Sequence, residues 1–228
     1  MLASLNWMQV EAYLQRDDRI VVITGACEQH ARLSLLADIH VPLAIAKAAC
    51  EREGVLVTPP LPYGISPYFA AYPGTISLSP ETFATVIREV LANLRKQGFK
   101  RILVSNGHGG NTGVLGPLIS ELNTAHPEVK VALFEWWRHP AVNAVAEAEG
   151  LAQYHANWSE NFPELTRVVP VADGQKSPVS LPPGTSAAAA RVLLGDGSFG
   201  GVYQAPYAVM DRFFAAAVDA MMAALHNL

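Results

Sequence analysis

Short apolar runs rich in β-branched residues alternate along this chain with longer segments in which apolar residues recur at helical spacing. The short runs predict buried strands over residues 19–24, 55–57, 101–104 and 129–134. The longer segments predict helices over residues 41–53, 80–97, 112–126, 141–153, 186–194 and 213–225, whereas residues 161–171 show no clear pattern. This alternation indicates right-handed βαβ units and a mainly parallel sheet.

The predicted fold class is therefore α/β, with a mainly parallel sheet flanked by helices. We expect a single domain over residues 1–228, because that length suits one such domain and is short for two. In open parallel sheets, ligands bind beyond the carboxyl ends of the strands. Polar clusters that directly follow a predicted strand are therefore the first candidates for chemistry.

The first polar cluster follows the strand over residues 19–24 and contains Glu28, His30 and Asp38. Glu28 and His30 are two positions apart, so in an extended segment both side chains point to one side. Asp38 precedes the helix expected from residue 41, where a carboxylate can reach back over the strand ends. The alternative is ordinary: Asp38 as a helix N-cap, and the other two as polar loop residues.

The second cluster, Asn-Gly-His-Gly-Gly-Asn at residues 106–111, follows the strand over residues 101–104. Its glycines let the backbone turn sharply and approach a ligand closely, and they leave His108 uncrowded. The spacing matches neither a P-loop nor a dinucleotide fingerprint, and a plain Gly-rich turn is the alternative. A third and weaker cluster, residues 154–161, supplies His155 and Glu160.

Together the clusters combine imidazole and carboxylate groups, the ligands that zinc and manganese ions prefer. Cys27 and Cys50 are not spaced as a pair of thiolate ligands. Two metal ions bridged by a carboxylate form a recurrent hydrolytic centre, which lowers the pKa of bound water and polarises a substrate carbonyl. The residues thus indicate a hydrolase whose nucleophile is a metal-bound hydroxide.

The order and spacing of several motifs make this interpretation more specific. Glu-Gln-His at 28–30 is followed by Leu-Ser-Leu at 33–35, Asp38, Tyr-Gly-Ile-Ser at 63–66, Tyr-Pro-Gly-Thr-Ile-Ser-Leu at 72–78 and the 106–111 motif. In this order the chain resembles the creatininase family, the creatinine amidohydrolases, across residues 21–111. A weaker His-Ala-x-x-x-Glu match lies at 155–160, and no motif matches beyond Glu160.

The resemblance implies a flavodoxin-like three-layer fold, assembly into hexamers and two divalent ions per subunit, Zn and/or Mn, with Fe as a further candidate. It implies that Glu28 and His108 bind one ion, that His30 and Glu160 bind the other, and that Asp38 bridges them. The predicted catalytic residues are His155, as proton donor to the leaving nitrogen, and Glu160. The predicted substrate-binding residues are Gly109, Gly110, Trp136 and Tyr72.

Several positions depart from the family pattern. Gly110 stands where creatinine-cleaving members have a metal-binding Glu, so the assignment of Glu160 follows the Gly-Gly subgroup. Ala31 and Arg32 stand where many members have Gly after Glu-Gln-His, and Arg32 is either an anion contact or a surface residue. Phe69 replaces a loop His that many members carry. These departures favour a substrate other than creatinine, and a more apolar one.

Composition narrows the partners. A net charge of −4 and a pI near 6.0 argue against nucleic acid, which needs a basic surface. Charged residues are only 16% of the chain, which favours a homo-oligomer. We expect no membrane partner, because the N-terminus lacks the pattern of a signal peptide and the apolar C-terminus is short for a span. Two thiols and no secretory signal favour the cytoplasm.

The predicted function is metal-dependent hydrolysis of a C–N bond in a small amide, cyclic or a formamide. Peptide-bond cleavage in a small modified peptide is the alternative within the enzyme class. A catalytically silent metal- or ligand-binding scaffold is the alternative outside it, although the intact set of candidate ligands argues against it. A phosphate-binding protein would need a cluster of basic residues near the Gly-rich loop, and only Arg32 is present.

Overall fold

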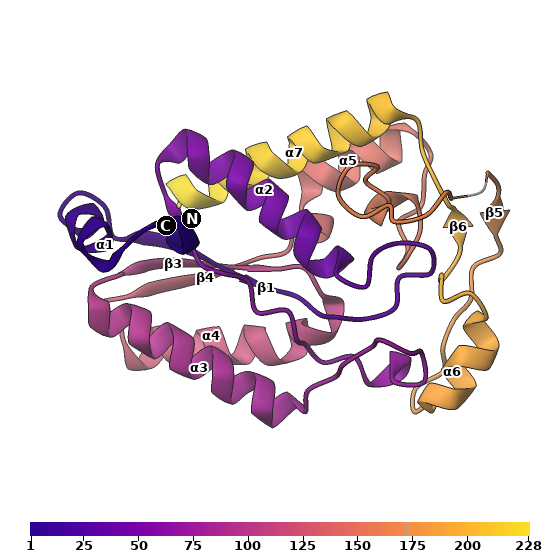
Figure 1. Ribbon diagram of the computed structural model, residues 1–228, viewed down its shortest axis with the longest axis horizontal. Helices are drawn as coiled ribbons and strands as arrows, with labels where there is room; N and C mark the ends of the chain where they lie inside the picture. Colours follow the sequence, from indigo (N-terminus) through magenta and orange to yellow (C-terminus); the bar gives the residue numbers. More distant parts are fainter. Residues whose placement is uncertain (172) are drawn as a thin grey trace.

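A four-stranded parallel sheet forms the centre of the molecule, as the computed structural model shows for residues 1–171 and 173–228 (Figure 1). Its order is β2-β1-β3-β4, and β1 pairs with β3 along the full length of both strands. The strands of this sheet are β1 (Arg19–Thr24), β2 (Leu56–Val57), β3 (Arg101–Asn106) and β4 (Lys130–Phe134). The predicted α/β fold with a mainly parallel sheet is therefore confirmed.

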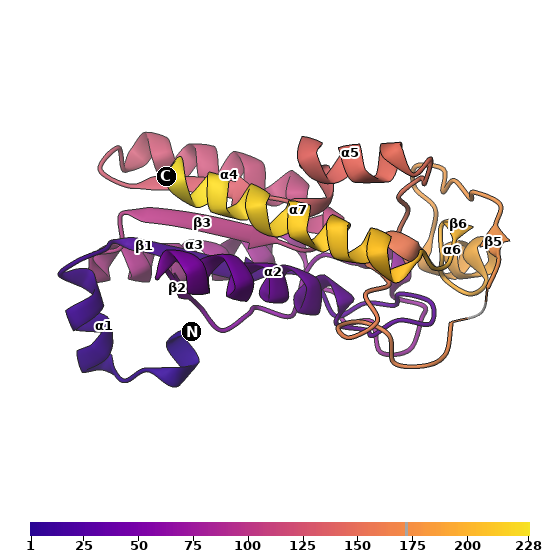
Figure 2. The ribbon, with the colours of Figure 1, turned by 90° about the horizontal axis from the view of Figure 1, so that it is seen from above.

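Helices cover both faces of this sheet and give three layers (Figure 1). One face carries α2, α5 and α7, and the other carries α3 and α4. The helices are α1 (Trp7–Leu14), α2 (Ala37–Glu53), α3 (Pro80–Gln97), α4 (Thr112–Ala125), α5 (Pro140–Ala148), α6 (Ala187–Leu194) and α7 (Tyr207–His226). Figure 2 shows α6 together with the antiparallel pair β5 (Gln175–Lys176) and β6 (Gly201–Val202) beyond the sheet, at the end opposite α1.

The strand β1 explains why the core has two halves. Val21 and Ile23 pack into the cluster formed with α2, α5 and α7, whereas Ile20 and Val22 pack into the cluster formed with α3 and α4. Successive side chains of a strand point to opposite faces, so a continuous apolar run serves both layers. The sheet is thereby fixed on both sides, and its carboxyl ends become a rigid edge.

The helix α2 begins earlier than the sequence pattern predicts. The expected start near residue 41 is wrong, because the helix starts at Ala37 and Asp38 lies in its first turn. Pro42 inside α2 has no N–H to donate to the backbone oxygen of Asp38. A Cβ on Gly25 or Gly107 would lie 2.2 Å or 1.8 Å from that oxygen. The carbonyl of Asp38 therefore sits against the ends of β1 and β3, where only glycine leaves room.

Other element boundaries differ modestly. The helix expected over residues 141–153 ends at Ala148, and α7 begins before the expected residue 213 and packs against α2 and α5. The helix α1 was not predicted, although Asn6 and Gln9 form a capping box at its start. Within the described residues, no helix is both long enough and apolar enough to cross a membrane.

Candidate metal centre

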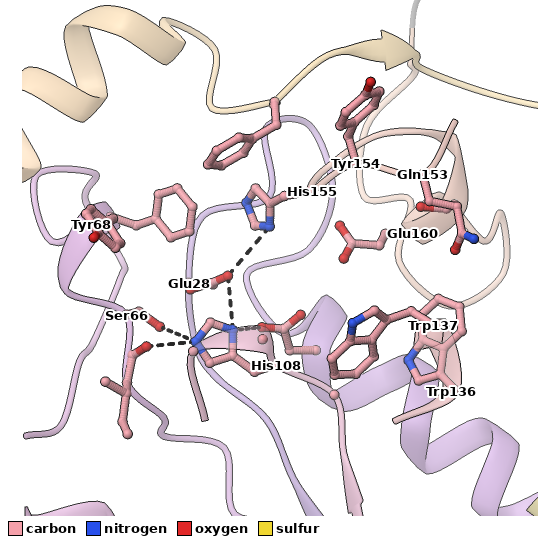
Figure 3. A pocket seen from close by; sticks show the side chains of 18 of the residues that line it. Glu28, Ser66, Tyr68, His108, Trp136, Trp137, Gln153, Tyr154, His155 and Glu160 are labelled. Carbon is pink, nitrogen blue, oxygen red and sulfur yellow. Dashed lines mark hydrogen bonds and ion pairs between the residues drawn. The ribbon is translucent and has the colours of Figure 1, made fainter. Parts of the chain in front are cut away.

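The predicted metal ligands converge beyond the carboxyl ends of β1 and β3. Glu28 and His30 lie on the segment after β1, Asp38 lies in the first turn of α2, and His108 follows β3. Glu160 closes the set from a short 3₁₀ turn, Trp158–Glu160. Figure 3 shows the side chains of Glu28, His108 and Glu160 turned toward the same cavity.

The ligand atoms fall into two groups that share Asp38. In the first group, Nδ1 of His108 lies 2.9 Å from Oδ2 of Asp38 and 3.3 Å from Oε1 of Glu28. In the second, Nε2 of His30 lies 3.0 Å from Oδ1 of Asp38 and 3.8 Å from Oε2 of Glu160. Each carboxylate oxygen of Asp38 thus faces a different histidine. The structure brings together all the residues that the sequence analysis predicted as ligands.

Both of these histidines are oriented through their other ring nitrogen. Nδ1 of His30 lies 3.1 Å from the backbone oxygen of Glu28, and Nε2 of His108 lies 2.9 Å from the backbone oxygen of Ile65. Each nitrogen in those pairs can donate its proton to the carbonyl, which leaves the opposite nitrogen with a lone pair toward the carboxylates. Metal-binding histidines are typically held in this way.

Charge and burial in the cluster fit a cation. Glu28 and Asp38 are 1% and 5% exposed, and His30 is fully buried. Oε2 of Glu28 is buried and has no hydrogen-bond partner among the described residues. Buried carboxylates are costly unless a positive charge or a metal ion compensates them. The donor set and the unpartnered oxygen therefore fit a divalent ion.

The pKa values of the metal-free cluster report the same excess of negative charge. Burial alone lowers the pKa of His30, but the nearby carboxylates of Asp38 and Glu160 raise it to about 10. Burial raises the pKa of Glu160 to about 7, against the opposing effect of His30. Without a metal, the histidines hold protons that partly compensate the carboxylates, and a cation would take over that role.

His155 lies beside the ligand cluster in an aromatic environment. Its ring stacks on Phe69 with centroids 4.7 Å apart, and Nε2 lies 3.0 Å from the backbone oxygen of Gln29. Nδ1 lies 3.7 Å from Oε1 of Glu28. Burial, followed by the charge of His30, lowers the pKa of His155 to about 4. The ring is therefore neutral near pH 7, and with Glu28 and His30 it also forms a third group of potential ligand atoms.

Asparagine side chains hold the loop that carries His108. Nδ2 of Asn106 donates to the backbone oxygen of His108 at 2.7 Å, and Oδ1 of Asn106 accepts from the backbone N–H of His108 at 3.2 Å. Asn111 accepts from the N–H of Ile65 and donates to the backbone oxygen of Gly25. The outer residues of the Asn-Gly-His-Gly-Gly-Asn motif thus tie this loop to its neighbours.

The departure at Ala31 has a structural counterpart. Ala31 has a φ of +52°, in the left-handed region that favours glycine. Its N–H donates to Oε1 of Gln29 at 3.0 Å. The chain therefore keeps the backbone turn that glycine would make easily, and it holds the turn with the side chain of Gln29.

The ligands line a cavity of about 520 Å³. Of the predicted substrate-binding residues, Gly109, Gly110 and Trp136 line it. Tyr72 does not: its hydroxyl donates to the backbone oxygen of Gly195 at 3.3 Å, and its ring packs edge-on against Phe69. Arg32 is also absent from the described lining.

The sequence analysis missed one part of the cavity wall. Phe199, from the region that carried no recognisable motif, lines the cavity and packs edge-on against His155 with ring centroids 5.6 Å apart. Tyr154 and Gln153 also line it. No local pattern distinguishes Phe199 from a core residue, because its position depends on contacts with residues more than forty positions away.

Comparisons with known proteins agree with this geometry. The family model of creatininase, described as creatinine amidohydrolase, matches residues 3–225. Creatinine amidohydrolase from Pseudomonas putida is 28% identical over 206 residues, which cover 80% of this chain and 78% of that protein. Mycofactocin precursor peptide peptidase from Mycolicibacterium smegmatis is 31% identical over 110 residues, 45% of this chain and 44% of that protein.

The fold agrees as well. The crystal structure of a creatinine amidohydrolase (creatininase) superposes with a TM-score of 0.82 at 24% identity, covering 99% of this chain and 96% of that one. The family match spans nearly the whole chain and includes the residues that form the cluster described above. The chain therefore belongs to the creatininase family and is an amidohydrolase of that family.

Proposed function

We propose that this chain hydrolyses the C–N bond of a small amide, cyclic or a formamide, at a centre of two divalent metal ions. The observation that carries the proposal is the position of Asp38, whose carboxylate oxygens each face a different histidine, His30 or His108. A shared carboxylate is the mark of a two-metal hydrolytic site.

In this proposal Glu28 and His108 hold one ion, His30 and Glu160 hold the other, and Asp38 contacts both. The nitrogen and oxygen donors suit Zn or Mn, with Fe as a further candidate. A creatininase has been solved in an Mn form and, as a mutant, in a Zn–Zn form. Ions of this kind activate water and polarise the carbonyl of the bound amide.

The side chains around the cluster would carry the proton and position the substrate. His155 is neutral near pH 7 and its Nδ1 faces the cavity side of Glu28. It can take up the proton released from water and deliver it to the leaving nitrogen, so that the broken bond yields a carboxylate and an amine. Gly109 and Gly110 offer backbone N–H groups at the cavity, and Trp136 forms part of its wall.

A peptidase acting on a small modified peptide is the second candidate. The partial match to mycofactocin precursor peptide peptidase and the size of the cavity favour it. A silent scaffold lacks such support, because the full ligand set is present and buried. Comparing release of amine from small amides with release from short peptides distinguishes the two enzymes.

We further propose a cytoplasmic homo-oligomer, a hexamer by family resemblance. The low share of charged residues, 16%, supports an oligomer, as do exposed apolar side chains such as Trp7, Tyr207 and Val192. Cys27 and Cys50 are free thiols, which is consistent with a reducing compartment. Light scattering of the purified protein measures the mass of the assembly.

Metal content tests the central claim. Protein purified without chelator or a His-tag should hold about two equivalents of zinc or manganese per chain by plasma mass spectrometry. Asp38→Ala should lose most of both ions and the amidohydrolase activity, because each ion loses a ligand and its shared charge. Asp211→Ala, an exposed aspartate on α7, is the matched control. Full activity in Asp38→Ala would contradict the two-metal proposal.

A further inference from the structure

An aromatic wall stands beside the ligand cluster. Phe69 stacks on His155, and Phe199 packs edge-on against both rings, with centroids 5.6 Å from His155 and 6.1 Å from Phe69. Phe69 and Phe199 both line the cavity, together with the half-exposed Tyr68. Figure 3 shows Tyr68 across the cavity from the tryptophans Trp136 and Trp137.

Phe199 is held firmly in this wall. Its backbone N–H donates to the oxygen of His155 at 3.1 Å, and Nζ of Lys176 donates to the backbone oxygen of Ser198 at 2.7 Å. The preceding Gly197 has a φ of +100° and accepts a bond from Nε2 of Gln29 at 3.0 Å. A Cβ on Gly197 would lie 1.8 Å from Oε1 of Gln29. The wall is therefore formed before a ligand arrives, so binding costs little ordering.

The cavity offers no side-chain cation to a substrate. Among the described residues that line it, none is Lys or Arg, whereas Glu28, Asp38 and Glu160 are acidic. Arg191 lies outside it and donates to the backbone oxygen of Ala71 at 2.8 Å. An anionic substituent directed away from the ligand cluster would therefore lose its hydration without gaining a counter-ion.

Unpartnered neutral groups complete the lining. Nε1 of Trp136, a residue that is 3% exposed, is a buried donor with no partner among the described residues, and Oε1 of Gln153 is a buried acceptor with none. Both residues line the cavity. A neutral substrate with its own carbonyl or N–H groups could satisfy such atoms, whereas an apolar flat group would pack on the phenylalanines.

We propose that Phe69 and Phe199 are specificity-determining residues that select uncharged amides bearing an aromatic or branched apolar group. The inference rests on the proposed function, because it assigns the substrate class of the same site. Burying a phenyl group against this wall should strengthen binding about 10-fold or more relative to a methyl group.

Binding of matched hydroxamic acids to the metal-loaded chain tests this. Acetohydroxamic acid, phenylacetohydroxamic acid and 4-carboxyphenylacetohydroxamic acid share one metal-binding group and differ in the side group. Calorimetry should give the phenyl compound a Kd about 10-fold or more below that of the methyl compound, with the carboxylated compound weaker than the phenyl one. In Phe199→Ala and Phe69→Ala the preference for phenyl should fall to about 3-fold or less, while the Kd of acetohydroxamic acid stays the same.

The outcomes separate the two proposals. Equal affinity for the methyl and phenyl compounds in the wild-type chain would overturn the inference and leave the proposed function intact, as would an unchanged preference in both variants. Failure of all three compounds to bind in a metal-dependent way would overturn the proposed function. Phe199→Leu keeps the packing volume if the Ala variant fails to fold, and it should weaken the phenyl preference without changing the metal content. Tyr207→Ala, an exposed aromatic on α7, is the control.

Discussion

Oε1 of Glu135, which follows β4, lies 2.8 Å from Nδ2 of Asn106, the last residue of β3. The same oxygen accepts from the hydroxyl of Thr112 at the start of α4, at 2.5 Å. Asn106 in turn holds the backbone of His108 on both its N–H and its oxygen. A carboxylate on the fourth strand thus supports the loop of a metal ligand on the third.

Removing this support should weaken metal binding. Glu135→Ala leaves the amide of Asn106 without its partner, so the loop of His108 gains freedom, and we expect an increase of about 10-fold or more in the metal Kd. Glu135→Gln keeps an acceptor oxygen and should stay within about 3-fold of wild type. Titration of the apoprotein with zinc against a competing chelator measures both, and Glu121→Ala on the exposed face of α4 is the control. Identical affinities in all the variants would show that Glu135 has no such role.

The close approach of Gly107 to Asp38 predicts a sharp difference between two glycine positions. Gly107→Ala would place a Cβ 1.8 Å from the backbone oxygen of Asp38, so the end of β3 must shift. We expect a loss of about 2 kcal/mol or more in the free energy of unfolding, together with weaker metal binding. Gly113→Ala is exposed in α4 with nothing within 4 Å, and it should be neutral or up to about 1 kcal/mol more stable. Urea unfolding of the apoproteins compares them.

His155 is expected to act in catalysis without holding the ions. His155→Ala should retain wild-type metal content and lose activity by about 10² to 10⁴, because the leaving nitrogen lacks its proton donor. Added imidazole should recover part of the rate, and His126→Ala, half-buried far from the cavity, should change nothing. Loss of metal in His155→Ala would instead identify this residue as a ligand, in the group that it forms with Glu28 and His30.

Asp17 should make the fold sensitive to acid. Burial alone raises the pKa of its carboxyl, but hydrogen bonds from Arg19 outweigh burial, and the pKa lies below the ordinary value of 3.8. A depressed pKa in the folded state contributes stability that is present above pH 3.8 and is lost as the pH falls through the folded pKa. Asp17→Asn should therefore be about 1 kcal/mol less stable than wild type at pH 7, with a difference that shrinks below pH 4.

The control for this experiment is Asp219→Asn, which removes the same charge from an exposed site on α7. Comparing the two variants by urea unfolding at each pH cancels contributions from the metal cluster. A difference between Asp17→Asn and Asp219→Asn that stays constant from pH 7 to pH 3 would show that the Asp17–Arg19 pair gives no acid-dependent stability.

Local signals were enough for the ligands and insufficient for the wall. Glu28, His30 and His108 stand directly after strands, and the strand ends of a parallel sheet meet at one edge, so their convergence followed from the pattern. The start of α2 was misplaced because the apolar spacing begins at Val41, whereas Asp38 enters the first turn through its contacts with the strand ends.

Tyr72 and Phe199 show the limit of such reasoning. Both are aromatic residues in irregular segments, and nothing in their neighbours tells which one lines the cavity. The structure turns the hydroxyl of Tyr72 toward Gly195 and places Phe199 in the wall. Each position is set by contacts between segments more than a hundred residues or several elements apart, and a single sequence carries no periodic trace of them.

The segment that supplies Phe199 lies outside the sheet, between α6 and β6, whereas Asp38 and His108 are anchored on the strand ends. The reactive groups and the side chain that meets the rest of the substrate are thus inherited through separate parts of the chain. Substitutions between residues 195 and 200 can alter which amides enter without disturbing the ions. Such a division lets descendants of one gene explore new substrates while the chemistry itself stays unchanged.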